Sequence, residues 1–286
     1  MAQSIPDVAM TKTVIARVPY LNCVPFFHGL SLDESWEWKD VSPRQLGIEA
    51  EAGTITAGPM ALGDFLRLQD RFERIGNLGV AVRGRCGSAL LFSRKPIRQL
   101  DDATIAVTDE TSTSALLLRL ILEKRYALSP KSYLPAPRQP SGQAGQRGDP
   151  NLPALNVTGQ AGDADAMLLI GDEALKLRAV NQQYPYEIDL AFEWWLWHHL
   201  PCVFAVWTVR KDCDAQEKQQ LSRALQKQLA MNTRQLDALA QERAATLGIP
   251  VEDLRQYLAN FLYRFGELEE RAIKQFEQLV HGHHLL

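Results

Sequence analysis

The stretch TIAVTDETSTSALLLRLIL, residues 104–122, joins a short β-type segment to an apolar helical segment. Thr104–Thr108 predicts a strand, and Ala115–Leu122 predicts the helix that follows it. Between them, residues 111–114 supply four consecutive hydroxyl side chains. The start of a helix carries unpaired backbone N–H groups and the positive end of the helix dipole. The stretch therefore predicts a place that suits a carboxylate or a phosphate.

Two interpretations of the four hydroxyl residues remain open from this stretch alone. Ser and Thr are favourable helix N-caps, and one hydroxyl is enough for a cap. Four in a row exceed what capping requires, which is the argument for an anion site. The sequence does not choose between the two at this point.

Outward from this stretch, strands and helices alternate through most of the chain. The predicted strands are Thr13–Val18, Ile55–Pro59, Leu78–Val82, Ser88–Phe92, Thr104–Thr108, Ala166–Ile170 and Val203–Val209. The predicted helices among them are Ser42–Gly53, Met60–Leu68, Ser114–Tyr126 and Glu173–Val180, with a turn at Gly171-Asp172. This alternation indicates an α/β protein with mainly parallel sheets.

Two parts of the chain depart from this alternation, the C-terminal region and an internal segment. After Lys211, the segments 214–247, 250–262 and 268–280 show apolar residues at helical spacing and predict amphipathic packing helices. Residues 135–162 are rich in Pro, Gly, Gln and Asn and predict an exposed, mobile insert. A tolerated surface loop is favoured for this insert over a lid.

Composition limits the function classes. A chain of 286 residues with 46% hydrophobic residues builds one large domain or two modest ones. The net charge of −3 and the scattered Lys and Arg residues disfavour nucleic acid and anionic membranes as partners. Met1–Thr11 lacks the apolar segment of a signal peptide, and no apolar run of 18 residues occurs. We therefore expect a cytoplasmic protein.

The cysteines give no sign of metal chemistry. Cys23, Cys86, Cys202 and Cys213 lie far apart in the sequence, and no pair has metal-ligand spacing. We expect four reduced thiols, with Cys23 as a small buried residue rather than a nucleophile. No metal site and no cofactor is predicted. G-x-S-x-G, P-loop and G-x-G-x-x-G motifs are absent from the sequence, which disfavours serine hydrolases, NTPases and dinucleotide enzymes.

Candidate ligand contacts gather at predicted strand ends. In open α/β sheets, ligands bind at the carboxyl ends of the strands. The residues there are Asn22, Gly58, Gly87, Ser88, Thr111, Ser112, Thr113, Ser114, Gly171 and Asp172. Most are amides, hydroxyls and glycines, which offer neutral hydrogen bonds to an anion. Plain structural roles stay open as well: Asn22 in an Asx-turn, Asp172 as an N-cap, and Ser88 as a small strand residue.

Five segments together resemble one family. They are IARVPYLNCVPFFHGL (15–30), residues 87–126 from GSALLFSRKP to LILEKRY, DAMLLIGDEAL (165–175), DLAFEWWLWHHLPCVFAVW (189–207) and YLANFLYRFGELEE (257–270). In this order they resemble the chorismate dehydratases of the futalosine route to menaquinone, the MqnA type of the MqnA/MqnD family. The sister 1,4-dihydroxy-6-naphthoate synthases usually open with a Ser-Pro-Cys-Pro-Asn-Asp type motif. Here the sequence is Tyr20-Leu-Asn-Cys-Val-Pro25, which favours the dehydratase.

The resemblance implies a two-lobed α/β fold like that of the type II periplasmic binding proteins, with the ligand between the lobes. Residues 1–94 and 208–286 would form one lobe, and residues 95–207 the other, with the insert 135–162. The implied reaction is loss of water from chorismate, a dicarboxylate, to give 3-[(1-carboxyvinyl)oxy]benzoate. A monomer or a homodimer fits equally well.

The same resemblance implies roles for the candidate residues. Asn22 and Ser88 would position the reacting part of the substrate, and residues 111–114 would hold one carboxylate. The proton acceptor would be the substrate's own side-chain carboxylate, which would explain why no protein base stands out.

Two departures from the family pattern bear on the substrate. Residues 58–61 read Gly-Pro-Met-Ala where members often carry a Ser-Ser pair, and residues 198–201 read His-His-Leu-Pro where members often carry Thr-Gly-Leu-Pro. Both changes are expected near the cleft. The alternatives to a dehydratase are a cytosolic, non-catalytic binder of a small carboxylate and the sister synthase.

Overall fold

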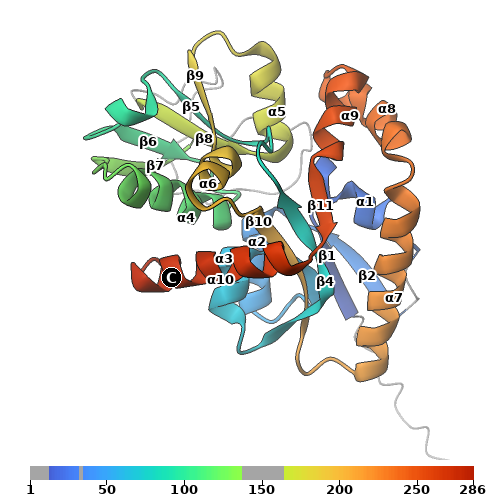
Figure 1. Ribbon diagram of the computed structural model, residues 1–286. Coiled ribbons are helices and arrows are strands. Elements are labelled where there is room, and N and C mark those ends of the chain that lie inside the picture. Colours follow the sequence, from blue (N-terminus) through green and yellow to red (C-terminus); the bar gives the residue numbers. More distant parts are fainter. Residues whose placement is uncertain (1–12, 32–34, 137–163) are drawn as a thin grey trace, which may run out of the picture.

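Two β-sheets organise the computed structural model, which describes residues 13–31, 35–136 and 164–286 (Figure 1). The first sheet has the strand order β11-β4-β10-β3-β1-β2. Its strands are β1 (Thr13–Arg17), β2 (Trp36–Asp40), β3 (Ala57–Ala61), β4 (Phe72–Val82), β10 (Cys202–Arg210) and β11 (Phe261–Arg264). The second sheet has the order β7-β6-β8-β5-β9. Its strands are β5 (Ala89–Ser93), β6 (Thr104–Val107), β7 (Ser132–Pro135), β8 (Ala166–Ile170) and β9 (Tyr186–Asp189).

Both sheets are mixed, so the prediction of mainly parallel sheets is wrong. In the first sheet, β1 is parallel to β2 and β3, whereas β10 is antiparallel to β3 and β4. In the second sheet, β6 is parallel to β7 and β8, whereas β5 is antiparallel to β8 and β9. The reason is the path of the chain: β5 and β10 each enter a sheet from the other lobe and run against the strands already there.

The chain changes sheets at two places. It leaves the first sheet after Val82 and enters the second at Ala89, and it returns between Asp189 and Cys202. Divisions at 94/95 and 207/208 therefore misplace β5 and β10, which pair with the second and the first sheet respectively. Hydrophobic patterning identified both strands but carried no information about which sheet each one joins.

Helices cover both sheets. With the first sheet go η1 (Leu21–Cys23), α1 (Val24–Phe27), α2 (Pro43–Glu51), α3 (Leu62–Leu68), α7 (Ala215–Asn232), α8 (Leu236–Leu247), α9 (Val251–Ala259) and α10 (Glu267–Gly282). With the second go η2 (Ile97–Gln99), α4 (Thr113–Arg119), the π-helical turn η3 (Leu120–Arg125), α5 (Gly171–Val180) and α6 (Leu190–His198). Figure 1 shows α7, α8 and α9 along one side of the molecule, with α9 opposite α5.

Local sequence explains several of these elements. The Ser42 side chain accepts a hydrogen bond from the Gln45 N–H at 3.3 Å and caps α2, with Pro43 in its first turn. In α7, Leu221, Leu225 and Leu229 repeat every four residues and are all buried. Strand β8 lies between β6 and β5 and is buried at every position, which is why its sequence shows no polar alternation.

Three further expectations differ from the structure or lie outside it. The segment 250–262 was predicted to be wholly helical, but β11 begins at Phe261 and pairs with β4. The predicted turn at Gly171-Asp172 is the first turn of α5. Most of the predicted insert, residues 137–162, lies outside the described residues. In the described part of the chain, no helix is both long and apolar enough to cross a bilayer.

Candidate functional site

A cavity lies between the two lobes, where β3, β4, β10 and the segment that follows β1 face the start of β5, the start of α4 and the junction of β8 with α5. Its empty volume, which includes space open to solvent, is about 550 Å³. The lining residues are Val18, Tyr20, Asn22, Cys23, Pro43, Pro59, Ala61, Val80, Ser88, Ala89, Thr111, Thr113, Ser114, Ile170, Gly171, Phe204 and Ala205. Among these described residues none is Asp, Glu, His, Lys or Arg. The cavity therefore combines apolar walls with hydroxyl and amide groups and no full charge.

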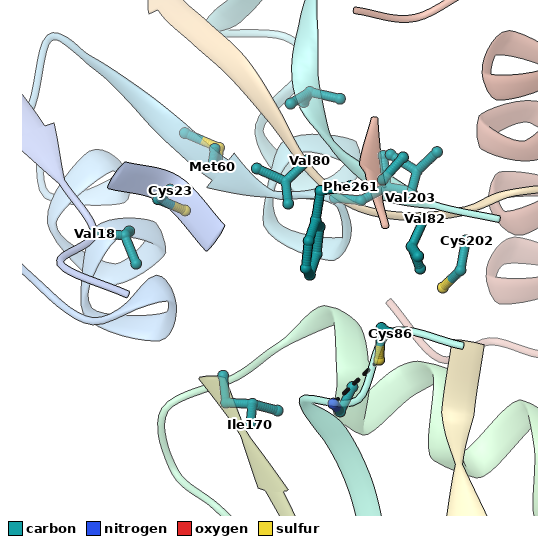
Figure 2. Close-up of a cluster of buried hydrophobic side chains, with 14 of the residues drawn as sticks. Val18, Cys23, Met60, Val80, Val82, Cys86, Ile170, Cys202, Val203 and Phe261 are labelled. Carbon is teal, nitrogen blue, oxygen red and sulfur yellow. Dashed lines mark hydrogen bonds between the residues drawn. The ribbon is translucent and has the colours of Figure 1, made fainter. Parts of the chain in front are cut away.

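Figure 2 shows how the two lobes present apolar side chains to one another near this cavity. Val18, Cys23 and Val80 come from the first lobe, and Ile170 lies across from them at the end of β8. All four residues line the cavity. Met60, also labelled there, is fully buried and is not a lining residue, whereas its neighbours Pro59 and Ala61 are. The departure at residues 58–61 thus lies at the cavity wall, as expected.

Asn22 is held on a short turn that enters the cavity. The Cys23 N–H donates to the carbonyl of Tyr20 at 2.9 Å, which closes the turn η1 directly after β1. The Asn22 Oδ1 atom is buried and has no hydrogen-bond partner in the described part of the chain. A buried acceptor without a partner carries a desolvation penalty that a ligand donor relieves. The Oδ1 atom of Asn22 is therefore free to accept a hydrogen bond from a ligand.

Ser88 lies at the point where the chain enters the second sheet. Its side chain is buried, and its Oγ atom is 2.9 Å from the hydroxyl of Tyr257 on α9. Its carbonyl accepts the N–H of Gly171 at 2.8 Å, which joins the start of β5 to the start of α5. The structure thus brings Asn22, Ser88 and Gly171 to one cavity.

The hydroxyl run 111–114 divides between two tasks. Thr111, Thr113 and Ser114 line the cavity, whereas Ser112 does not. Ser112 Oγ donates to Asp64 Oδ2 at 2.6 Å, across to α3 of the other lobe. The Thr113 hydroxyl accepts the Gly63 N–H at 3.0 Å and donates to the Phe204 carbonyl at 3.1 Å. Part of the run therefore binds the lobes to each other.

Helix capping also accounts for part of the run. The Thr111 hydroxyl oxygen accepts the N–H of Ser114, the second residue of α4, at 3.1 Å. The two interpretations of the four hydroxyls are thus not exclusive. Capping uses Thr111, lobe contact uses Ser112 and Thr113, and three of the four residues also face the cavity.

Gly171 and Asp172 act differently although they are neighbours. Gly171 lines the cavity and has φ +57°, and a Cβ there would lie 2.6 Å from Cδ2 of Tyr20. Only glycine gives the Tyr20 ring this close approach. Asp172 lies outside the cavity lining, and its Oδ1 accepts the Leu21 N–H at 3.0 Å across the lobes. Burial raises the pKa of the Asp172 carboxyl, and the Leu21 N–H partly opposes that shift.

The other two predicted glycines do not line the cavity. A Cβ on Gly58 would lie 2.8 Å from Cβ of Ala16, so this glycine serves the close packing of β3 against β1. Gly87 has φ +74°, and its N–H donates to Asp189 Oδ2 at 2.8 Å. Gly87 lines a second cavity instead.

The two titratable groups that line the first cavity, Tyr20 and Cys23, are both protonated at neutral pH. Burial, with help from the carboxylate of Asp172, raises the pKa of Cys23 to about 12. Burial and the Glu110 carboxylate, which accepts a hydrogen bond from the Tyr20 hydroxyl, raise the pKa of Tyr20. Both groups keep their protons at neutral pH, so neither is placed to accept one.

The second cavity lies on the far side of the Ser88–Tyr257 pair and has an empty volume of about 1180 Å³, open solvent included. Its lining includes five charged side chains, namely Arg85, Arg178, Glu187, Asp189 and Asp253, together with Tyr257 and Asn260. No group of three metal-ligating side chains occurs among the described residues, there or elsewhere.

Three features of the site were not recognised from the sequence. Asp64, Glu110 and Tyr257 each receive or share a hydrogen bond across the lobes, and none of them was predicted to have a role. Conversely, His198 was expected near the cleft and does not line it. Its ring lies 4.3 Å from that of Trp194 and 4.2 Å from that of Trp197, and burial lowers its pKa to about 4.

Solved structures resemble the whole fold. A protein from Archaeoglobus fulgidus matches with a TM-score of 0.72 and 16% identity, over 98% of this chain and all of the other. The alkanesulfonate-binding protein of Xanthomonas axonopodis pv. citri, bound to MOPS, gives 0.65 and 16% over 96% and 94%. A Candida albicans protein with the generic periplasmic binding protein fold gives 0.63 and 12% over 95% and 90%. The two-lobed fold expected from the sequence is thereby confirmed.

Sequence comparison is more specific than the fold. A chorismate dehydratase from Thermus thermophilus is 28% identical over 285 residues, which is 95% of this chain and 96% of the relative. The sequence profile of the menaquinone biosynthesis family matches residues 13–281. This match spans both sheets and every lining residue of the first cavity. The chain belongs to the menaquinone biosynthesis family.

Proposed function

We propose that this protein is a chorismate dehydratase, a carbon–oxygen lyase that converts chorismate to 3-[(1-carboxyvinyl)oxy]benzoate and water. Family membership and the relative from Thermus thermophilus support this reaction. The observation that carries it is the unpartnered Oδ1 of Asn22 in a cavity with no charged lining residue. We further place the enzyme in the cytoplasm, as a monomer or homodimer that needs no cofactor, nucleic acid or membrane.

The cavity suits the substrate's shape and chemistry. Chorismate has a six-membered ring, which the apolar walls formed by Val18, Val80 and Ile170 accommodate. Its carboxylates accept hydrogen bonds, and the hydroxyls of Thr111 and Ser114 lie along one side of the cavity, whereas the Thr113 hydroxyl already donates to the Phe204 carbonyl. We assign one carboxylate to this side.

Asn22 and Ser88 would bind the part of the ring that reacts. The C4 hydroxyl is a donor as well as the leaving group, and Asn22 Oδ1 is an acceptor without a partner. An Asn22–hydroxyl hydrogen bond would fix which face of the ring meets the proton acceptor. Ser88, with its hydroxyl at the same cavity, would donate to the departing oxygen.

The reaction balances without an external reagent. The C3–H bond breaks, its electron pair forms the new ring double bond, and the C4–O bond breaks to release hydroxide, which becomes water with the C3 proton. Since Tyr20 and Cys23 both keep their protons, we assign the role of proton acceptor to the enolpyruvyl carboxylate of the substrate itself. Aromatisation of the ring supplies the driving force, so the protein's main contribution is orientation.

The decisive experiment mixes purified protein with chorismate, without added metal or cofactor, and follows products by chromatography with mass detection. The expected product has lost one water and carries an aromatic enolpyruvyl ether. Binding of chorismate without turnover would indicate a non-catalytic carboxylate binder instead. Neither binding nor turnover would mean that the Pro59–Ala61 wall selects another substrate, such as that of the sister synthase.

A further inference from the structure

The Ser88–Tyr257 pair forms a partition between the two cavities. Ser88 lines the first cavity, Tyr257 lines the second, and their hydroxyl oxygens are 2.9 Å apart. Both side chains are buried, with 5% of each exposed. A hydroxyl pair at this place separates an uncharged compartment from a charged one.

The pair also joins the two lobes. Ser88 directly precedes β5 of the second sheet, and Tyr257 is on α9, which leads into β11 of the first. Figure 1 shows α9 opposite α5, at the rim of the second lobe. The bond therefore exists only when the lobes stand as they do here, so the orientation of the Ser88 hydroxyl depends on lobe closure.

Packing fixes the Tyr257 ring in the direction of Ser88. The ring of Phe261, the first residue of β11, meets it edge-on with 4.9 Å between centroids. Figure 2 shows Phe261 between the lobes, extending from the first lobe toward the second. Burial raises the pKa of the Tyr257 phenol, so it stays a neutral O–H group with one hydrogen to donate.

We propose that Tyr257 is a positioning residue, an inference that rests on the proposed function. Its phenol donates a hydrogen bond to Ser88 Oγ, and the hydroxyl hydrogen of Ser88 therefore points into the first cavity. A phenol is the better donor of the two hydroxyls, and a Ser oxygen that accepts from one side is free to donate to the other. The Ser88 hydrogen is then aimed at the departing C4 oxygen before the substrate reacts.

A double-mutant cycle tests this coupling. Tyr257→Phe keeps the ring and its contact with Phe261, and it removes the hydroxyl. We expect kcat to fall roughly tenfold with KM nearly unchanged, since one hydrogen bond that acts on the transition state is lost. In a Ser88→Ala background, Tyr257→Phe should cost nothing further, because the phenol has no serine left to orient.

Tyr263→Phe is the matched control. Tyr263 is a buried tyrosine of the same C-terminal region, and its hydroxyl has no hydrogen-bond partner in the described part of the chain. Its loss should leave kcat within about twofold. Equal effects of Tyr257→Phe with and without Ser88 would overturn the inference, as would an effect of Tyr257→Phe no larger than that of Tyr263→Phe.

The wild-type assay separates the two ideas. If the wild type does not dehydrate chorismate, the proposed function fails, and the inference that rests on it falls as well. If the wild type is active and the two substitutions are additive, only the role of Tyr257 is overturned.

Discussion

The two cavities on either side of the Ser88–Tyr257 pair differ in charge although they lie in one interlobe interface. The first is lined by apolar groups, hydroxyls and one amide, with no charged side chain among the described lining residues. The second is lined by two Arg and three acidic residues. The charged side chains of the second cavity can pair with one another, as Arg178 Nε and Glu187 Oε2 do at 3.5 Å. The uncharged cavity instead leaves the Oδ1 of Asn22 without a hydrogen-bond partner. The difference indicates that the first cavity, rather than the second, is where a ligand binds.

The largest expected effect in this comparison is at Asn22. Asn22→Ala removes the unpartnered acceptor, and we expect kcat to fall by about 10²–10³-fold, as for the loss of one preorganised polar group at a reacting atom. Chorismate binding should persist within a few-fold, because the carboxylate contacts proposed for Thr111 and Ser114 remain. Turnover measured by product chromatography and binding measured by calorimetry give the two values.

Full activity of Asn22→Ala would remove Asn22 from the reaction and with it the argument from the unpartnered Oδ1. Loss of binding together with turnover would instead assign Asn22 to substrate capture. The expected pattern separates orientation from affinity.

The second prediction concerns the tight wall of the first cavity. Gly171→Ala places a methyl group 2.6 Å from the Tyr20 ring at φ +57°. We expect the free energy of unfolding to fall by roughly 2–4 kcal/mol, from backbone strain and overpacking together. Denaturant titration measures this change.

Gly248→Ala is the matched control for that experiment. Gly248 has φ +69° at the end of α8, and a Cβ there meets nothing within 4 Å. It isolates the strain, for which we expect about 1 kcal/mol. Equal losses of unfolding free energy in the two variants would show that the Tyr20 ring moves aside without cost and that the cavity wall is not tightly packed there.

The third prediction uses pH at the edge of the first cavity. Burial raises the folded-state pKa of Asp172, so the free energy of unfolding contributed by this group is greatest below its unfolded pKa of about 3.9 and falls as pH rises through the folded value. Asp172→Asn keeps an Oδ1 for the Leu21 N–H and removes the charge. Stability of the variant relative to the wild type should therefore increase as pH rises from about 4.

Denaturant titrations of both proteins across that pH range provide the measurement. A constant difference between them would mean that Asp172 carries no pH-dependent cost in the folded state. Asp172→Ala, which also loses the acceptor, should be less stable than Asp172→Asn at every pH.

The smallest effect is expected in the second cavity. Asn260 lines that cavity, is exposed, and makes no contact with the first. Asn260→Ala should leave both kcat and KM for chorismate within about twofold. A loss comparable with that of Asn22→Ala would show that the two cavities act as one site and would break the comparison.

The sequence predicts the elements of this protein better than their assembly. β1, β6 and β8 were located nearly to the residue, because each is an uninterrupted β-branched or apolar run. β2, β7, β9 and β11 were missed, since strands of four or five residues carry too little periodicity. The sheet to which β5 and β10 belong was misassigned, because pairing depends on contacts between segments over a hundred residues apart, such as β10 with β3.

The candidate site follows the same division. Asn22, Ser88 and three of the hydroxyl residues were located at strand ends, where backbone geometry alone brings side chains to a cleft. Gly58 and Asp172 were included for the same reason, but they serve packing and lobe contact. The contact of Tyr257 with Ser88 was not identified, because the two residues are 169 positions apart in the sequence and the family resemblance of residues 257–270 gave Tyr257 no role.

The absence of charged groups along the described lining of the first cavity also affects the ligand's own acid–base chemistry. A carboxylate transferred from water into an apolar compartment, with no cation beside it, holds its proton more tightly than it does in solution. The enolpyruvyl carboxylate of bound chorismate is thereby a stronger base than the same group free in water. The side-chain carboxylate of a bound, unreactive chorismate analogue, followed by carbon-13 chemical shift, should therefore have a pKa above its solution value.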